Sequence, residues 1–176
     1  MIEVTQARCI LRPYRTGDIP ALVRYANNPL IFANVRDGFP NPYTREKAVE
    51  WMKLAKEKKQ DGALILAIEQ DNELIGSIGI HPNKDVYRLT AEIGYWLAEP
   101  FWNQGIMSHC VKILTEYAFK HSDLIKIYAG VFSNNSASMR VLEKAGYHLE
   151  AIHKKAVIKL GKILDEHVYV IFKLES

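Results

Sequence analysis

The chain has 176 residues, of which 48% are hydrophobic and 24% charged, and its formal net charge is +3 at pH 7. These values are ordinary for a globular protein and argue against the fibrous and disordered classes. The small positive charge requires neither a nucleic-acid nor a membrane partner, although it suits an anionic ligand. We therefore expect one domain, residues 1–176, without linker, repeat or low-complexity tract.

Cysteine usage and hydropathy predict a cytoplasmic protein. Cys9 and Cys110 lie far apart and form no CxxC motif, so we expect two small buried residues rather than a disulfide framework. The first residues, Met1–Leu11, do not combine a basic start with a long apolar run, as a signal peptide would. No apolar stretch approaches the ~18 residues that a membrane span needs.

The N-terminal part of the chain predicts a strand followed by two helices. The strand is expected at Cys9–Leu11. One helix can begin after Asp18, where Pro20 suits the first turn, and another after Thr44, a good capping residue. An irregular, proline-containing stretch, residues 34–43, separates the two helices.

The rest of the chain predicts an antiparallel meander, two further helices and a final hairpin. Its turns are indicated by Asp71-Asn72 and Leu160-Gly161, and Gly146 is expected to end the second of these helices. The expected elements are, in order, the strands Ala63–Ile68, Leu74–Ile80 and Leu89–Leu97, the helix Gly105–Phe119, the strand Ile125–Phe132, the helix Asn135–Ala145, and the strands Tyr147–Ile158 and Ile163–Phe172.

The strand-to-helix turn within Tyr95–Ile106 is a candidate anion site. A strand ends, a tight loop passes Pro100, and a long helix begins near Gly105. The first N–H groups of a helix have no partner within it and carry the positive end of its dipole, which suits a pyrophosphate. Gly105 lets the backbone approach a ligand closely. An ordinary strand-to-helix turn has the same residues, so the local sequence leaves both interpretations open.

The next helix offers a second candidate group. Asn135 is a good N-cap and Ser138 occupies the third helical position. Ser138 shares a face with Val141, Leu142 and Ala145, so its hydroxyl should point toward the sheet. That hydroxyl either donates to a ligand or satisfies a backbone group with nothing bound.

A third candidate lies in the strand before the turn. In an extended strand, Glu92, Gly94 and Trp96 share one face. A carboxylate in such an apolar groove suits a general base that works near neutral pH. The alternative is a carboxylate at the rim of the sheet, paired with a nearby Arg or Lys.

In their order and spacing, these segments resemble the GNAT superfamily of N-acetyltransferases, and within it the RimJ/RimL-type group of ribosomal-protein N-terminal acetyltransferases. The resemblance implies an α/β (α+β) fold with a mixed, mostly antiparallel sheet of six to seven strands, splayed in a V and flanked by about four helices. It also implies acetyl-CoA-dependent transfer of an acetyl group to a primary amine by direct attack. The segments that carry it are Leu11-Arg12-Pro13 with Asp18, Phe39 to Thr44, Glu92 to Leu97, Trp102 to Met107 and Asn135 to Tyr147.

The resemblance assigns roles to individual residues. Ser138 matches the residue that would protonate the departing thiolate. A carboxylate that some relatives use as base would fall near Val157, which cannot accept a proton, so Glu92 is the first candidate base and Asp165 the second. The residues expected to bind acetyl-CoA are Tyr95, Trp96, Leu97, Asn103, Gln104, Gly105, Ile106, Met107, Ser108, Asn135 and Ser138.

The acceptor is expected against the proline-stiffened loop, through Asn34, Arg36 and Phe39. It is a protein N-terminus or a small-molecule amine, and a homodimer is an allowed assembly. No metal is expected because the histidines lack ligand spacing, and no nucleic-acid or membrane partner is expected because the basic run Lys53–Lys59 fits a solvated helix face. The competing class is a non-catalytic acyl-CoA-binding domain of the same fold.

Overall fold

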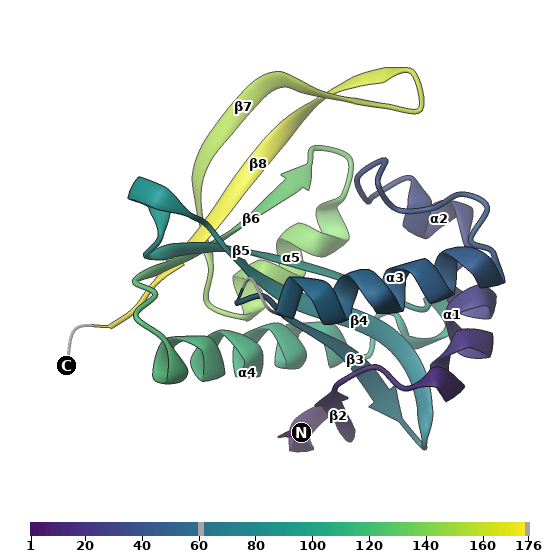
Figure 1. The fold of residues 1–176 in the computed structure, drawn as a ribbon. Helices are drawn as coiled ribbons and strands as arrows, with labels where there is room; N and C mark the ends of the chain where they lie inside the picture. Colours follow the sequence, from purple (N-terminus) through teal and green to yellow (C-terminus); the bar gives the residue numbers. More distant parts are fainter. Residues whose placement is uncertain (60–61, 175–176) are drawn as a thin grey trace. The chain divides into compact units, whose positions relative to one another are not determined.

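The computed structural model describes residues 1–59 and 62–174 (Figure 1). By hydrogen bonding its strands form one eight-stranded sheet in the order β1-β2-β3-β4-β5-β6-β8-β7. The chain groups into two compact units. The first contains Met1–Gly79 and Tyr95–Ile106, and the second contains Ile80–Gly94 and the chain from Met107 onward. The single domain over residues 1–176 stays a prediction, and residues 60–61 and 175–176 of that range lie outside the described residues.

The first unit contains β1 (Ile2–Val4), η1 (Thr5–Ala7), β2 (Cys9–Arg12), η2 (Thr16–Asp18), α1 (Ile19–Ala26), α2 (Pro29–Phe32), α3 (Arg45–Lys58), β3 (Leu64–Gln70) and η5 (Glu99–Phe101). The second contains η4 (Asp85–Tyr87), β6 (Lys126–Phe132), α5 (Ser136–Lys144), β7 (His148–Lys159) and β8 (Lys162–Phe172). Three elements belong to both units, namely β4 (Glu73–Pro82), β5 (Thr90–Leu97) and α4 (Ile106–His121).

The core of the first unit forms where α1 and α3 pack against the sheet. Asp18 precedes α1, Pro20 occupies its first turn, and Leu22 on its apolar face is fully buried together with Leu74 of β4. Burial of a side chain of this size contributes roughly 1.5–3 kcal/mol, so this face fixes the helix on the sheet. Thr44 caps α3 by accepting a hydrogen bond from the N–H of Lys47 at 3.3 Å.

A buried ion cluster joins three segments of the first unit. Arg12 of β2 donates to both carboxylate oxygens of Asp18 at 2.6 and 2.8 Å and also to Glu69 of β3. Asp18 additionally accepts from the backbone N–H of Arg15 at 2.7 Å. Hydrogen bonding to Asp18 is the main cause that raises the pKa of Arg12, so the guanidinium stays charged although only 2% of the residue is exposed.

The sheet of the second unit combines a parallel strand pair with a long antiparallel hairpin. β5 pairs with β6 in parallel over Thr90–Glu92, and α4 provides the crossover between them. β6 pairs antiparallel with β8 from Lys126 to Phe132, and β8 pairs with β7. Leu160 and Gly161 have φ angles of 49° and 75°, so both adopt the left-handed backbone that a two-residue hairpin turn requires. This confirms the predicted turn.

The two faces of β6 differ in burial. Ile127, Ala129 and Val131 are buried at 0–4% exposure, whereas Lys126, Tyr128 and Gly130 are half-buried. Because residues alternate across a strand, the buried set packs into the core of the unit and the other set faces a pocket. This pocket has a volume of about 480 Å³ and is lined by Asn83, Lys84, Tyr87, Lys126, Tyr128 and Val168, among others.

The structure confirms the predicted fold class and most of the predicted elements, but one short strand, one short α-helix and the 3₁₀ turns were missed. The expected six to seven strands become eight through β1, whose three residues include one buried side chain, Val4. The additional helix α2 has four residues and is capped by Asn28, whose side chain accepts from the N–H of Leu30 at 2.8 Å. Among the described residues, no helix is long and apolar enough to cross a membrane.

Candidate active site

The turn before α4 has the geometry expected of an anion site. The loop residues Trp102 to Gly105 are exposed, and α4 begins directly after them and runs for 16 residues. Asn103 and Gly105 have φ angles of 61° and 77°, a left-handed conformation that favours glycine. The first N–H groups of α4 therefore adjoin an exposed loop at the positive end of a long helix.

The side chains of the first residues of α4 point away from solvent. Ile106, Met107 and Ser108 are 3%, 6% and 8% exposed. A ligand at this terminus would therefore meet backbone N–H groups rather than these three side chains.

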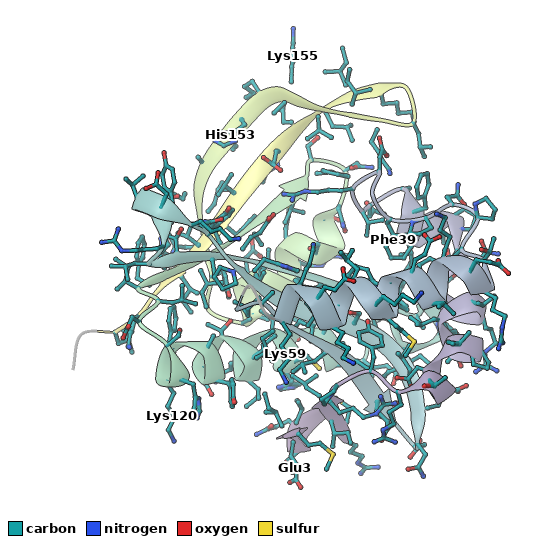
Figure 2. All side chains as sticks on the ribbon, viewed as in Figure 1. Glu3, Phe39, Lys59, Lys120, His153 and Lys155 are labelled. Carbon is teal, nitrogen blue, oxygen red and sulfur yellow. The ribbon has the colours of Figure 1, made fainter. Side chains whose placement is uncertain are left out.

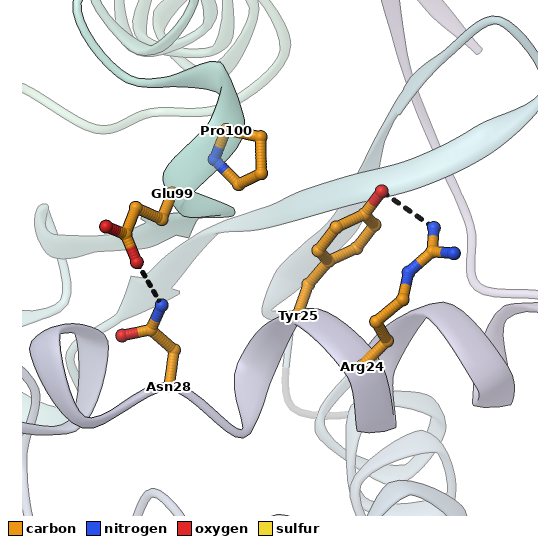
Figure 3. Close-up of a pocket in the computed structure, with 5 residues that line it drawn as sticks. All are labelled: Arg24, Tyr25, Asn28, Glu99 and Pro100. Carbon is orange, nitrogen blue, oxygen red and sulfur yellow. Dashed lines mark hydrogen bonds between the residues drawn. The ribbon is translucent and has the colours of Figure 1, made fainter.

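Residues outside the predicted set of site residues hold this loop in place. The Trp102 indole N–H donates to the backbone carbonyl of Leu97 at 2.7 Å, and the ring of Phe101 lies edge-on to Tyr25 at 6.0 Å. Asn28 donates to Glu99 at 2.6 Å across a pocket of about 510 Å³ (Figure 3). The signal that could have revealed Asn28 is the Asn-Pro pair, which predicts a helix cap.

The C-terminal end of β5 is held tightly against β4. A Cβ at Gly76 would lie 2.6 Å from the carbonyl oxygen of Trp96 and 3.2 Å from Cα of Leu97. The glycine therefore permits the close approach of the two strands, and the backbone of Trp96 and Leu97 is fixed by it. Tyr95 and Trp96 are half-buried, whereas Leu97 is buried.

The predicted acceptor loop is irregular, as expected. The ring of Phe39 contacts two aromatic rings of the first unit. Its centroid lies 5.2 Å from that of Tyr43 and 6.1 Å from that of Trp96. Asn34 is half-buried and donates to the carbonyl of Leu30 at 2.9 Å, and Arg36 is exposed. The structure thus brings Phe39 to the predicted cofactor strand residue Trp96.

In the second unit, Glu92 is half-buried on β5 and pairs in register with Tyr128. Directly paired residues point to the same face of a sheet. Glu92 therefore lies on the same sheet face as Tyr128, which lines the pocket of the second unit.

The predicted cap of α5 is confirmed. The side-chain oxygen of Asn135 accepts a hydrogen bond from the backbone N–H of Ser138 at 3.1 Å. Leu142 and Ala145 on the same helical face are buried, and Ser138 is half-buried. Ser138 is therefore less buried than these two neighbours on its helical face, and the predicted direction of its hydroxyl stays a prediction.

Asp165, the second candidate base, is engaged within the β7–β8 hairpin. One carboxylate oxygen accepts from the backbone N–H of Lys155 at 2.9 Å and the other from Nζ of Lys154 at 2.9 Å. The backbone hydrogen bond from Lys155, followed by the Lys154 ammonium, lowers the pKa of Asp165. A lowered pKa makes a poorer proton acceptor, so this environment suits a general base poorly.

The lowered pKa of Asp165 predicts an acid-dependent contribution to stability. The folded-state pKa lies below the unfolded value of 3.8, so the contribution is present above that value and is lost as the pH falls through the lower folded pKa. We expect Asp165→Asn to destabilise the protein at neutral pH, with a difference that vanishes in strong acid. Urea unfolding across this pH range measures it, and a difference that stays constant with pH would contradict the assignment.

No group of three or more His, Cys, Asp or Glu side chains is placed to hold a metal ion in the part of the chain that the structure describes. Cys9 and Cys110 are both buried, as predicted.

The model of the acetyltransferase (GNAT) domain family matches residues 8–148. The chain belongs to this family of enzymes. The probable N-acetyltransferase YjcK of Bacillus subtilis (strain 168) is 36% identical over 124 residues, which cover 70% of this chain and 67% of YjcK. The ribosomal-protein-serine acetyltransferase of Escherichia coli (strain K12) is 32% identical over 107 residues, 61% of this chain and 59% of that protein.

Solved structures share the fold at lower sequence identity. RimL, a ribosomal L7/L12 α-N-protein acetyltransferase in complex with coenzyme A, superposes with a TM-score of 0.86 at 24% identity and 97% coverage of both chains. The microcin C7 self-immunity acetyltransferase MccE, in complex with acetyl-CoA and AMP, has a TM-score of 0.83 at 21% identity, with 94% of this chain and 93% of MccE covered.

Proposed function

We propose that the chain is an acetyl-CoA-dependent N-acetyltransferase that acetylates a primary amine by direct attack. The observation that carries the proposal is the exposed left-handed turn at Gly105, directly before the 16-residue helix α4. Such a terminus binds a pyrophosphate through backbone N–H groups and the helix dipole. Family membership and the coenzyme A or acetyl-CoA in the complexes of RimL and MccE support the choice of this ligand.

The proposed cofactor residues divide by the part of the ligand they would hold. The backbone of Asn103 to Ser108 would hold the pyrophosphate, and the backbone of Tyr95 to Leu97 would bind the pantetheine as an added strand. Asn135 would reach the same arm. These residues fit the role because the loop is exposed, its glycine carries no Cβ, and the strand end is held rigidly by Gly76.

Acetyl-CoA, when bound, supplies an acetyl group activated as a thioester. Glu92 would accept a proton from the attacking amine, and Ser138 would donate one to the departing thiolate. A backbone N–H near Tyr95 or Trp96 would polarise the thioester carbonyl. Glu92 and Ser138 are half-buried, so each combines partial shielding from water with access for a ligand.

We propose a protein N-terminus as the acceptor, ahead of a small-molecule amine. The E. coli relative and RimL are named as acetyltransferases of ribosomal proteins, which supports this order. The loop with Asn34, Arg36 and Phe39 would form one wall of the acceptor site, with the aromatic ring of Phe39 packed against Trp96.

A thermal shift with acetyl-CoA tests the proposal. At 100 times the dissociation constant, binding should add about 2.7 kcal/mol to the stability of the native state. Gly105→Ala should remove the shift. Gly161→Ala is the matched control, because Gly161 has a φ of 75° against 77° at Gly105 and no atom within 4 Å of its Cβ position.

Both variants should be destabilised by a similar backbone strain of about 1 kcal/mol. Only the loss of the acetyl-CoA-dependent thermal shift should therefore distinguish Gly105→Ala from Gly161→Ala. A wild-type protein with no shift at millimolar acetyl-CoA would exclude the cofactor. Binding without thiol release on any of a panel of peptides and amines would favour a non-catalytic acyl-CoA-binding domain.

A further inference from the structure

A carboxylate that the sequence did not single out shares a sheet face with Glu92. Glu92 pairs with Tyr128 across β5 and β6, and Glu166 pairs with Phe132 across β6 and β8. Tyr128 and Phe132 are four residues apart on one strand and so point to the same side. Since paired residues also share a side, Glu92 and Glu166 lie on one face of the sheet.

Gly130 determines where the Glu166 carboxylate lies. Gly130 follows Tyr128, the partner of Glu92, by two residues or about 7 Å along β6, and it points to the same face. A Cβ at position 130 would overlap Oε1 of Glu166 and lie 2.9 Å from its Cδ. The carboxylate therefore lies over the bare backbone of β6, the strand between β8 and β5.

The second oxygen of this carboxylate faces His153. Oε2 of Glu166 lies 3.5 Å from Nδ1 of His153, its register partner on β7. The His153 side chain is 57% exposed and that of Glu166 only 22%. Figure 2 labels His153 on β7. The pair thus links a shielded carboxylate above the sheet to an imidazole in contact with water.

The other titratable side chains on this face are accounted for by contacts. Lys126 binds Glu150 at 2.7 Å, and the Tyr128 hydroxyl lies 3.4 Å from the side-chain amide of Asn83. Lys154, next to His153 on β7, binds Asp165. His153 of β7 contacts Glu166 directly, Glu92 of β5 and Tyr128 of β6 share its sheet face, and the Lys126–Glu150 pair lies six residues along β6 from Phe132, the partner of Glu166.

Acetylation of an amine requires two separate proton transfers. At neutral pH the amine is mostly R–NH₃⁺, which cannot attack until it loses one proton. The attacking nitrogen then loses a second proton, which Glu92 is proposed to accept and which balances the proton gained by the thiolate. The first proton leaves the protein altogether and needs its own acceptor with a route to water.

We propose, resting on the proposed function, that Glu166 binds the acceptor's ammonium group and that His153 carries its first proton to solvent. The ammonium N–H bond breaks as Glu166 accepts the proton, and Glu166 returns to a carboxylate by passing it to neutral His153. The amine becomes R–NH₂ and the imidazole becomes an imidazolium, so charge and protons balance. The exposed imidazolium then releases the proton to water.

Thiol release with a peptide that has a free N-terminal serine, followed from about pH 6 to about pH 10, tests this role. Glu166→Gln and His153→Gln should each lose about 10²-fold in kcat/KM at the acid end. Above the α-amine pKa of about 8 the peptide is already neutral, so both variants should approach the wild-type rate. Glu150→Gln, which removes a carboxylate from the same strand pair, should follow the wild type throughout.

Gly130→Ala adds a positional test, because its Cβ would displace the Glu166 carboxylate without removing it. It should show the same acid-selective loss while acetyl-CoA still raises the melting temperature. A loss of equal size at every pH would indicate a structural role and overturn the proposal, as would full activity in Glu166→Gln or an equal loss in Glu150→Gln. These outcomes contradict only this inference, whereas a wild type without acetyl-CoA binding contradicts the proposed function as well.

Discussion

Replacing Arg12 with alanine should lower the free energy of unfolding by about 3–5 kcal/mol, the cost of leaving buried charges without their partner. Arg12 satisfies Asp18 through two hydrogen bonds and Glu69 through a third, and both acidic residues are 5% exposed. The exposed Arg15 lies 3.4 Å from Glu69 and would remain as its weaker partner. Without the guanidinium, two buried carboxylates lie close together in surroundings of low dielectric. Because small proteins have only about 5–15 kcal/mol of total stability, this is a large fraction.

Urea unfolding measures the loss, and Arg24→Ala is the matched control. Arg24 also binds a glutamate, Glu73, but its side chain is 58% exposed, so the pair should contribute no more than about 1 kcal/mol. A triple variant, Arg12→Leu with Asp18→Asn and Glu69→Gln, removes all three charges and should recover much of the loss. Equal effects of Arg12→Ala and Arg24→Ala would contradict the importance of burial.

Most of the fold could be predicted because its long elements carry strong periodicity. The helix α1 combines Asp18, Pro20 and an apolar stripe, and the final hairpin combines two long strands with Leu160-Gly161. Short elements carry too few residues for a period to appear. β1 has three residues and α2 four, so packing and a cap at Asn28, rather than periodicity, determine them.

The candidate site was only partly predictable, because the sequence does not determine strand register. Asp165 and Glu166 are neighbours and point to opposite faces, so a shift of one residue exchanges their roles. The structure shows that Glu166, not Asp165, shares a sheet face with Glu92, because Glu166 pairs with Phe132. The pairing of β7 with β8 is irregular between His153 and Val157, which local sequence does not predict. The position of Glu166 over Gly130 depends on residues 36 apart in sequence, which local patterns do not connect.

Replacing Glu92 with glutamine should lower kcat by about 10²–10⁴-fold, or about 2.7–5.5 kcal/mol in the barrier, at every pH. The glutamine keeps the size of the side chain but cannot accept the proton that leaves the nitrogen during attack. That proton must be removed whether the amine arrives charged or neutral, so raising the pH should not restore the rate. The acetyl-CoA thermal shift should be unchanged, which separates chemistry from cofactor binding.

This pH-independence distinguishes Glu92 from the proposed role of Glu166. In the double variant the two losses should multiply at acid pH, because the residues act on different protons, and only the Glu92 loss should remain at alkaline pH. Glu150→Gln again serves as the control for a change of charge on the same sheet face. If Glu92→Gln kept its rate within about threefold, or recovered at alkaline pH, Glu92 would not be the base of the attack step.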